Sequence, residues 1–177
     1  MVCAEGNQQD RFDEIIKFHA DSNNLDWVFI KRQMLAESEG NPYAISHLGA
    51  MGLMQFMPGT WSEWGKGDPY DPRANIEAGV KYMAFLMSKF GEIPDEIERY
   101  KFAFASYNAV RHNINHCLEY ARQATGAPGS YDDWVAAGRS PGPWQKWEVA
   151  SEFLPMVTGR FASITRNYVA KIVGDDS

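Results

Sequence analysis

Cysteine and positive charge are scarce in this chain of 177 residues. Two cysteines, Cys3 and Cys117, are too few for a disulfide framework, and nothing in their spacing requires them to pair. The chain has 17 Lys and Arg against 23 Asp and Glu, which gives a formal net charge of −6. Because binding to nucleic-acid phosphates needs clustered cations, we expect no nucleic-acid partner.

Residues 41–62 carry no formal charge, but they do not predict a membrane span. Pro42, Pro58, His47 and Gln55 lie within this run, and in lipid they would leave polar and backbone groups unsatisfied. The first ten residues also lack the apolar stretch of a signal peptide. We therefore expect no membrane insertion and no leader in this chain, with a leader already trimmed from a precursor as the alternative.

Strand-like alternation is nearly absent, and helical periodicity dominates. Asp26 is a candidate N-cap for a helix whose apolar stripe contains Ile30 and Met34 and continues to Glu37. Glu39 lies about 200° further round the helix than Glu37. The spacing therefore predicts that Glu37 faces inward and that Glu39 faces solvent.

The same periodicity predicts further helices, and a T-x-x-E capping box predicts another that begins at Thr60, with Glu63 completing the box. The other expected helices cover about residues 12–19, 75–90, 95–107, 110–123 and 159–173.

A glutamate at the end of an apolar stripe is partly removed from water, which raises its pKa toward the range of a general acid. Glu37 is therefore a candidate proton donor. Periodicity alone favours the structural alternative, in which Glu37 caps nearby backbone or pairs with an arginine.

Several blocks of sequence, in this order, closely resemble the soluble lytic transglycosylase family, whose fold is that of goose-type lysozyme. They are Glu37-Ser38, Asn41-Pro42, "GAMGLMQFMP" (49–58), "DPYDPRANIEAGVKYM" (68–83) and "SYNA" (106–109). The resemblance implies a mainly α, lysozyme-like single helical domain over residues 1–177 with a saccharide cleft. It also implies an insertion at about 124–158.

The resemblance implies cleavage of the β-1,4 bond between N-acetylmuramic acid and N-acetylglucosamine in peptidoglycan, leaving a 1,6-anhydro sugar. Glu37 matches the family's catalytic acid, which first donates a proton and then, as a carboxylate, accepts one from the muramic 6-hydroxyl. No cofactor and no metal are implied.

Other matched residues acquire substrate-binding roles from the same resemblance. Ser46 matches a serine that hydrogen-bonds the acid. The residues that match the sugar pocket and its neighbouring elements are Gln55, Met57, Tyr107, Asn108 and Tyr168. Without the family pattern, core packing of Met57 and a buried ring at Tyr107 would be the favoured interpretations.

Two positions depart from the family pattern. Val110 stands where the family usually has glycine after "YNA", which predicts either a continuing helix or a different backbone path. Ile164 stands where many members have Glu, so the resemblance implies no carboxylate support for the reacting sugar from that helix.

The insertion contains Trp134, Trp144 and Trp147, and Trp61 and Trp64 are further aromatics that we expect to be exposed. Their faces could stack on sugars in outer subsites, but core packing is the favoured interpretation for most of them.

His112 and His116 are spaced i, i+4 beside Cys117, a pattern compatible with zinc. Only the two histidines share a helix face, and no further pair completes four ligands. We therefore expect a solvated helix face and no metal.

Two other functions remain open. A goose-type hydrolase (muramidase) that uses water would need a second carboxylate, for which Glu63, Asp68 and Asp71 are candidates. A non-catalytic wall-binding or virion-assembly module would not need Glu37. We expect a monomer that acts on glycan strands of the cell wall in the periplasm. A phage lysis or wall-penetration enzyme is favoured over a bacterial remodelling enzyme.

Overall fold

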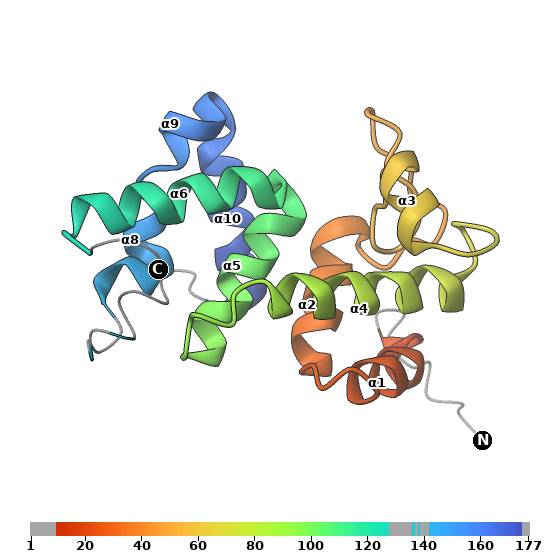
Figure 1. The fold of residues 1–177 in the computed structure, drawn as a ribbon. Coiled ribbons are helices and arrows are strands. Elements are labelled where there is room, and N and C mark those ends of the chain that lie inside the picture. Colours follow the sequence, from red (N-terminus) through yellow and green to blue (C-terminus); the bar gives the residue numbers. More distant parts are fainter. Residues whose placement is uncertain (1–9, 128–135, 137, 139–141, 175–177) are drawn as a thin grey trace, which may run out of the picture. The chain divides into compact units, whose positions relative to one another are not determined.

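The computed structural model describes residues 10–127, 136, 138 and 142–174. Within this part of the chain the regular elements are helices, joined by turns and two isolated β-bridges, so the mainly α prediction is confirmed (Figure 1). The chain divides into two compact units, residues 1–85 and 86–177. No helix of the described residues is long and apolar enough to cross a membrane.

The first unit contains α1 (Asp13–Asp21), α2 (Trp27–Ser38), α3 (Pro58–Trp64) and most of α4 (Pro72–Ser88). The predicted N-cap of α2 is confirmed, because the Asp26 side chain accepts a hydrogen bond of 2.8 Å from the Val28 amide. Fully buried apolar side chains from these helices and the loop after α2 form the core of this unit: Ile16, Ile30, Met34, Leu53, Met54, Ile76, Val80 and Met83.

The start of α3 differs from the prediction. The helix begins at Pro58, with Met57 as its N-cap residue, so Thr60 lies inside the helix and the predicted capping box does not form. Proline favours the first helical position because its fixed φ suits the helix and its missing N–H would be unsatisfied there anyway. Pro58 therefore decides where the helix starts.

The second unit contains α5 (Glu96–Ala109), α6 (Arg111–Ala124), η2 (Pro143–Gln145), α8 (Trp147–Ser151), α9 (Leu154–Thr158), η3 (Gly159–Phe161) and α10 (Ala162–Val173). The helix α5 packs against both α6 and α10 and is the central element of this unit (Figure 1). Its core includes Tyr100, Phe102, Phe104, Ile114, Trp144, Leu154 and Ile172. Cys117 is a free thiol in this core, and burial raises its pKa to about 11.

The tryptophan side chains of the described residues are buried or half-buried. Trp144 and Trp147 are buried, which confirms the core-packing interpretation for both. Trp61 and Trp64 are half-buried instead of exposed, with ring centroids 5.5 Å from Phe56 and 5.2 Å from Tyr82 respectively. Trp134 lies outside the described residues.

The connection between α5 and α6 is a single residue in an unusual conformation. Val110 has φ 68° and ψ 128°, and its side chain is 64% exposed. The continuing helix is therefore wrong, and the alternative of a different backbone path is confirmed. A β-branched residue is strained at positive φ, whereas glycine is not.

Candidate active site

The last turn of α2 holds Glu37 at the boundary between core and surface. Ile30 and Met34, on the same stripe, are fully buried, Glu37 is half-buried, and Glu39 is exposed. Glu39 ends the helix with φ 55°, and its amide donates to the Leu35 carbonyl at 3.1 Å. The predicted difference between the environments of Glu37 and Glu39 is confirmed.

The loop after α2 is closed on itself by backbone hydrogen bonds. Gly52 N–H donates to the Ala44 carbonyl at 2.9 Å, and Ser46 N–H donates to the Ala50 carbonyl at 3.0 Å. Further along, Met51 and Phe56 exchange two backbone bonds of 2.9 and 3.0 Å. The uncharged run is thus an ordered loop with a defined backbone path.

Ser46 and Gln55 help to build this loop and keep one polar function each. Ser46 Oγ accepts from the amides of Leu48 and Ala50 at 3.3 and 3.0 Å, which leaves its hydroxyl proton to donate. Gln55 Nε2 donates to the carbonyls of Ala44 and Gly52 at 3.2 and 2.9 Å, which leaves Oε1 as an acceptor.

Some apolar side chains of the loop face solvent. Tyr43, Ile45, Leu48 and Met57 are all exposed large hydrophobic residues. Met57, one of the residues matched to the sugar pocket, is 43% exposed, so it does not serve as plain core packing. The loop therefore offers a surface that is apolar and free of formal charge.

A buried amide, Asn75 at the start of α4, clamps this loop. Asn75 Oδ1 accepts from the Met54 amide at 2.7 Å, and Nδ2 donates to the carbonyls of Pro69 at 2.7 Å and Met51 at 3.4 Å. Gly52 has φ 74°, and a Cβ there would lie 2.4 Å from the Pro69 carbonyl oxygen, so only glycine fits the approach.

The role of Asn75 was not predicted from the sequence. The available signal was a polar residue directly before the apolar stripe of α4, inside the block 68–83. Its partners are 6 to 24 residues away in sequence, so local periodicity could not identify them.

In the second unit, the predicted residues lie on α5 and α10. Tyr107 and Asn108 occupy the last turn of α5 and Tyr168 lies on α10; both tyrosines are half-buried and Asn108 is exposed. Asn108 Oδ1 accepts a bond of 2.9 Å from Thr165 Oγ1, and Thr165 is buried one turn before Tyr168. Thr165 was also missed, although its i, i+3 spacing from Tyr168 was visible in the sequence.

The carboxylates considered for a hydrolase are exposed. Asp68 Oδ1 accepts from the Tyr70 amide at 2.9 Å, and Asp71 Oδ1 accepts from the Ala74 amide at 2.8 Å. Both side chains thus shape the turn into α4, and Glu63 is exposed on α3.

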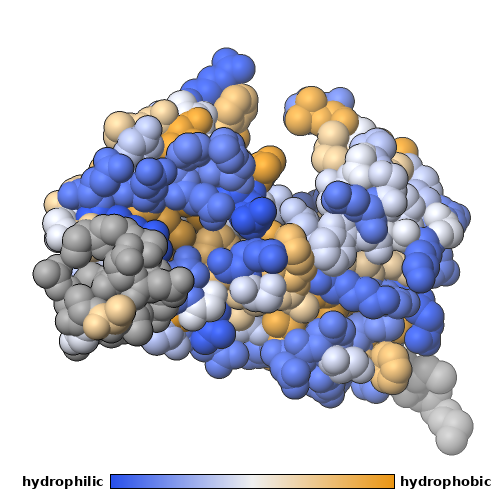
Figure 2. Space-filling view, viewed as in Figure 1, coloured by the Kyte–Doolittle hydropathy of each residue, from blue (hydrophilic) through white to orange (hydrophobic). Residues whose placement is uncertain are grey.

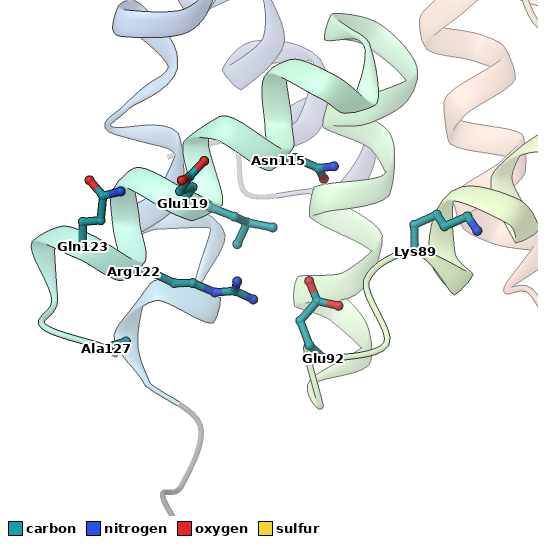
Figure 3. A pocket seen from close by; sticks show the side chains of 8 residues that line it. Lys89, Glu92, Asn115, Glu119, Arg122, Gln123 and Ala127 are labelled. Atoms are coloured by element: carbon teal, nitrogen blue, oxygen red, sulfur yellow. The ribbon is translucent and has the colours of Figure 1, made fainter. Parts of the chain in front are cut away.

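A cavity of about 520 Å³ lies in the second unit (Figure 3), but it contains none of the predicted site residues. Its lining mixes both charge signs and comes mainly from α6: Lys89, Glu92, Asn115, Leu118, Glu119, Arg122, Gln123 and Ala127. The Arg122 guanidinium lies 4.3 Å from the centroid of the buried Trp144 ring, which fixes one wall. This cavity does not mark the candidate active site.

The helical arrangement is similar to that of solved soluble lytic transglycosylases. The 70 kDa enzyme from Escherichia coli matches with a TM-score of 0.59 and 24% identity, over 93% of this chain and 24% of that chain. Slt from Pseudomonas aeruginosa matches with a TM-score of 0.54 and 21% identity, over 92% of this chain and 25% of that chain. These similarities concern the fold, and they confirm the lysozyme-like class expected from the sequence.

The family follows from the sequence comparison. The model of the transglycosylase SLT domain matches residues 14–128, and the chain belongs to this family. A membrane-bound lytic murein transglycosylase F from Desulfosudis oleivorans is 34% identical over 160 residues, 89% of this chain and 32% of that protein. The protein of the same name from Yersinia pestis is 34% identical over 118 residues, 67% of this chain and 24% of that protein. The chain therefore spans a third or less of the length of these relatives.

Proposed function

We propose that this chain is a peptidoglycan lytic transglycosylase that cleaves the β-1,4 bond between N-acetylmuramic acid and N-acetylglucosamine and leaves 1,6-anhydro ends. The observation that carries the proposal is the half-buried Glu37 at the end of α2, directly before an ordered loop without formal charge. Membership of the SLT family and the names of the relatives support the same activity.

In the proposed mechanism, one carboxyl group acts twice. Protonated Glu37 donates its proton to the glycosidic oxygen as the bond to the anomeric carbon breaks. The resulting carboxylate then takes the proton of the muramic 6-hydroxyl, whose oxygen attacks the anomeric carbon and closes the anhydro ring. Glu37 ends the cycle protonated, and no water is consumed.

The other residues bind and orient in this proposal. Ser46 uses its remaining proton to donate to the Glu37 carboxylate, which stabilises the ionised form that the second step needs. The exposed apolar side chains of the loop contact the faces of the sugar rings. Substrate binding is assigned to Ser46, Gln55, Met57, Tyr107, Asn108 and Tyr168.

Two solved relatives support the proposed activity. The Pseudomonas aeruginosa Slt structure is that of an inactive mutant in which glutamine replaces a glutamate, so that enzyme needs a glutamate carboxyl group. A 70-kDa soluble lytic transglycosylase has been solved in complex with bulgecin A, so that fold holds a ligand. The hydrolase alternative is less well supported, because Asp68 and Asp71 are exposed and engaged in the turn before α4.

We further infer that residues 1–177 work as one catalytic domain, with an insertion at about 124–158, and that the protein is a monomer acting on the cell wall in the periplasm. The reaction is the same whether the enzyme serves phage-mediated lysis and wall penetration or bacterial wall remodelling. The names of the relatives, which are murein transglycosylases, support the wall as the site of action.

Mass spectrometry of the fragments released from purified peptidoglycan tests the function. We expect muropeptides with 1,6-anhydro ends, each lighter by one water molecule than the hydrolysed product. Fragments with only reducing ends would establish a muramidase instead. Absence of fragments with a correctly folded protein would favour the non-catalytic module.

A further inference from the structure

The solvent-facing side of α6 carries two histidines that the proposed function does not use. His112 and His116 lie one turn apart in the first half of the helix, and Cys117 points into the core. Figure 2 shows a mostly hydrophilic surface over this part of the second unit. His112 is exposed and His116 is half-buried, so the pair is accessible to a small solute from water.

The two rings already meet at a metal-binding distance. His112 Nε2 and His116 Nε2 are 3.1 Å apart, with ring centroids 4.5 Å apart and ring planes at 86°. A zinc ion bound by two imidazoles at 2.0–2.1 Å in tetrahedral geometry holds the two nitrogens about 3.3 Å apart. The observed separation is close to this value, and rotation of the two imidazoles about their side-chain torsions would aim both lone pairs at one ion.

A carboxylate on the same face lies near one of the rings. Glu119 Oε2 lies 3.7 Å from His116 Nδ1, on the opposite side of the ring from the Nε2 atom that faces His112. A carboxylate at Nδ1 favours the tautomer with its proton there, which leaves the Nε2 lone pair for a metal. A closer approach of the carboxylate on metal binding would give the carboxylate–histidine–metal order found in many metal sites.

We propose that His112 and His116 form a binding site for a divalent transition-metal ion of the zinc class, with Glu119 beside His116 and water completing the coordination. No group of three or more His, Cys, Asp or Glu able to hold a metal ion occurs in the described part of the chain. The site thus offers two protein ligands and binds reversibly. It plays no part in the proposed glycan cleavage, which needs no metal.

The competing explanation is a hydrogen bond between two neutral imidazoles, one donating from Nε2 and the other accepting. That arrangement fits the same distance and needs no metal to form. The sequence predicts a solvated face because no further pair completes four protein ligands, whereas the proposed site needs only two.

Calorimetric titration of zinc chloride into the untagged chain at neutral pH distinguishes the two explanations. All proteins carry Cys3→Ser, so that the remaining thiol is the buried Cys117. We expect one zinc per chain and at least tenfold weaker binding in both His112→Gln and His116→Gln. Glu119→Gln should weaken binding less than either, and Cu²⁺ should bind more tightly than Zn²⁺.

The matched control is His47→Gln, which removes an exposed histidine of the first unit and should leave zinc affinity unchanged. Circular dichroism checks that each variant folds. Absence of zinc binding, or unchanged affinity in His112→Gln, would leave only a hydrogen-bonded pair and overturn the proposal. Either result is independent of the fragments released from peptidoglycan, so the metal site and the enzymatic function fail separately.

Discussion

The two units of this protein hold their candidate site residues in different ways. In the first unit, Ser46 and Gln55 lie on an irregular loop whose backbone is fixed by hydrogen bonds to Asn75 and to the loop itself. In the second unit, Tyr107, Asn108 and Tyr168 lie on helices, and one side-chain pair, Thr165 with Asn108, ties α10 to α5.

The difference has a physical consequence. A loop has no regular ladder to satisfy its backbone groups, so its shape depends on a few buried polar contacts. A helix satisfies the hydrogen-bonding groups of its own backbone, and apolar packing fixes its position. The first unit should therefore be sensitive to single polar substitutions, whereas the second should tolerate them.

The largest effect should come from Glu37→Gln. The amide is nearly isosteric but cannot donate the proton, so we expect the initial rate of peptidoglycan turbidity clearance to fall by at least about 10²-fold. Glu39→Gln, two residues further along and exposed, is the matched control and should be nearly silent. A Glu37→Gln protein with more than a tenth of the wild-type rate would remove Glu37 from the acid role.

Next in size is Asn75→Ala, which leaves the Met54 amide and the Pro69 carbonyl without their buried partner. We expect a loss of about 2–4 kcal/mol in the free energy of unfolding, measured in urea. Lysis should also slow under conditions where the variant is folded. The control is Asn113→Ala in the second unit, which removes one half-buried hydrogen bond to the Ala109 carbonyl. Equal losses of unfolding free energy in the two variants would contradict the difference between the units.

Local signals predicted much of this fold. Asp26 caps α2, and the stripe Ile30–Met34–Glu37 faces inward, because both features depend on neighbours within one helix. Thr60 failed as a cap because Pro58 begins the helix two residues earlier. Asn75 and Thr165 could not be found in this way, because a side chain's long-range partner depends on tertiary structure and not on periodicity.

A smaller effect is expected from Ser46→Ala. A hydrogen bond to a charged group contributes about 1.5–3 kcal/mol, so loss of a bond to the Glu37 carboxylate should slow initial lysis by roughly 10- to 100-fold. The variant's thermal unfolding must be checked, since Ser46 also accepts from two amides. Ser22→Ala, an exposed serine in the same unit, controls for the substitution itself, and a normal rate in Ser46→Ala would make that serine structural only.

In the second unit, Val110→Gly should stabilise the protein. Glycine relieves the strain at φ 68°, and its greater freedom in the unfolded chain offsets part of the gain, so we expect a net increase of about 1 kcal/mol in the free energy of unfolding. Val28→Gly, at a part-exposed helical position in α2, should have the opposite sign. Destabilisation by Val110→Gly would show that the valine side chain makes a compensating contact.

The smallest effect concerns His19 and pH. Burial lowers the pKa of His19, and nearby Arg73 and Lys81 lower it further while Glu77 opposes them. The unfolded chain therefore binds a proton more readily than the native protein, so this histidine costs stability as the pH falls below about 6.5. The free energy of unfolding should drop less between pH 7.5 and 5.5 in His19→Leu than in wild type, and identical slopes would contradict the assignment.

Digestion of peptidoglycan in water enriched in oxygen-18 tests the central claim that Glu37 acts alone, with a sugar hydroxyl in place of water. The single-carboxylate mechanism predicts that the new muramic ends are anhydro sugars without oxygen-18, because the attacking oxygen belongs to the substrate. Incorporation of one oxygen-18 at each new reducing end would show that water attacks the anomeric carbon, and would contradict the single-carboxylate mechanism.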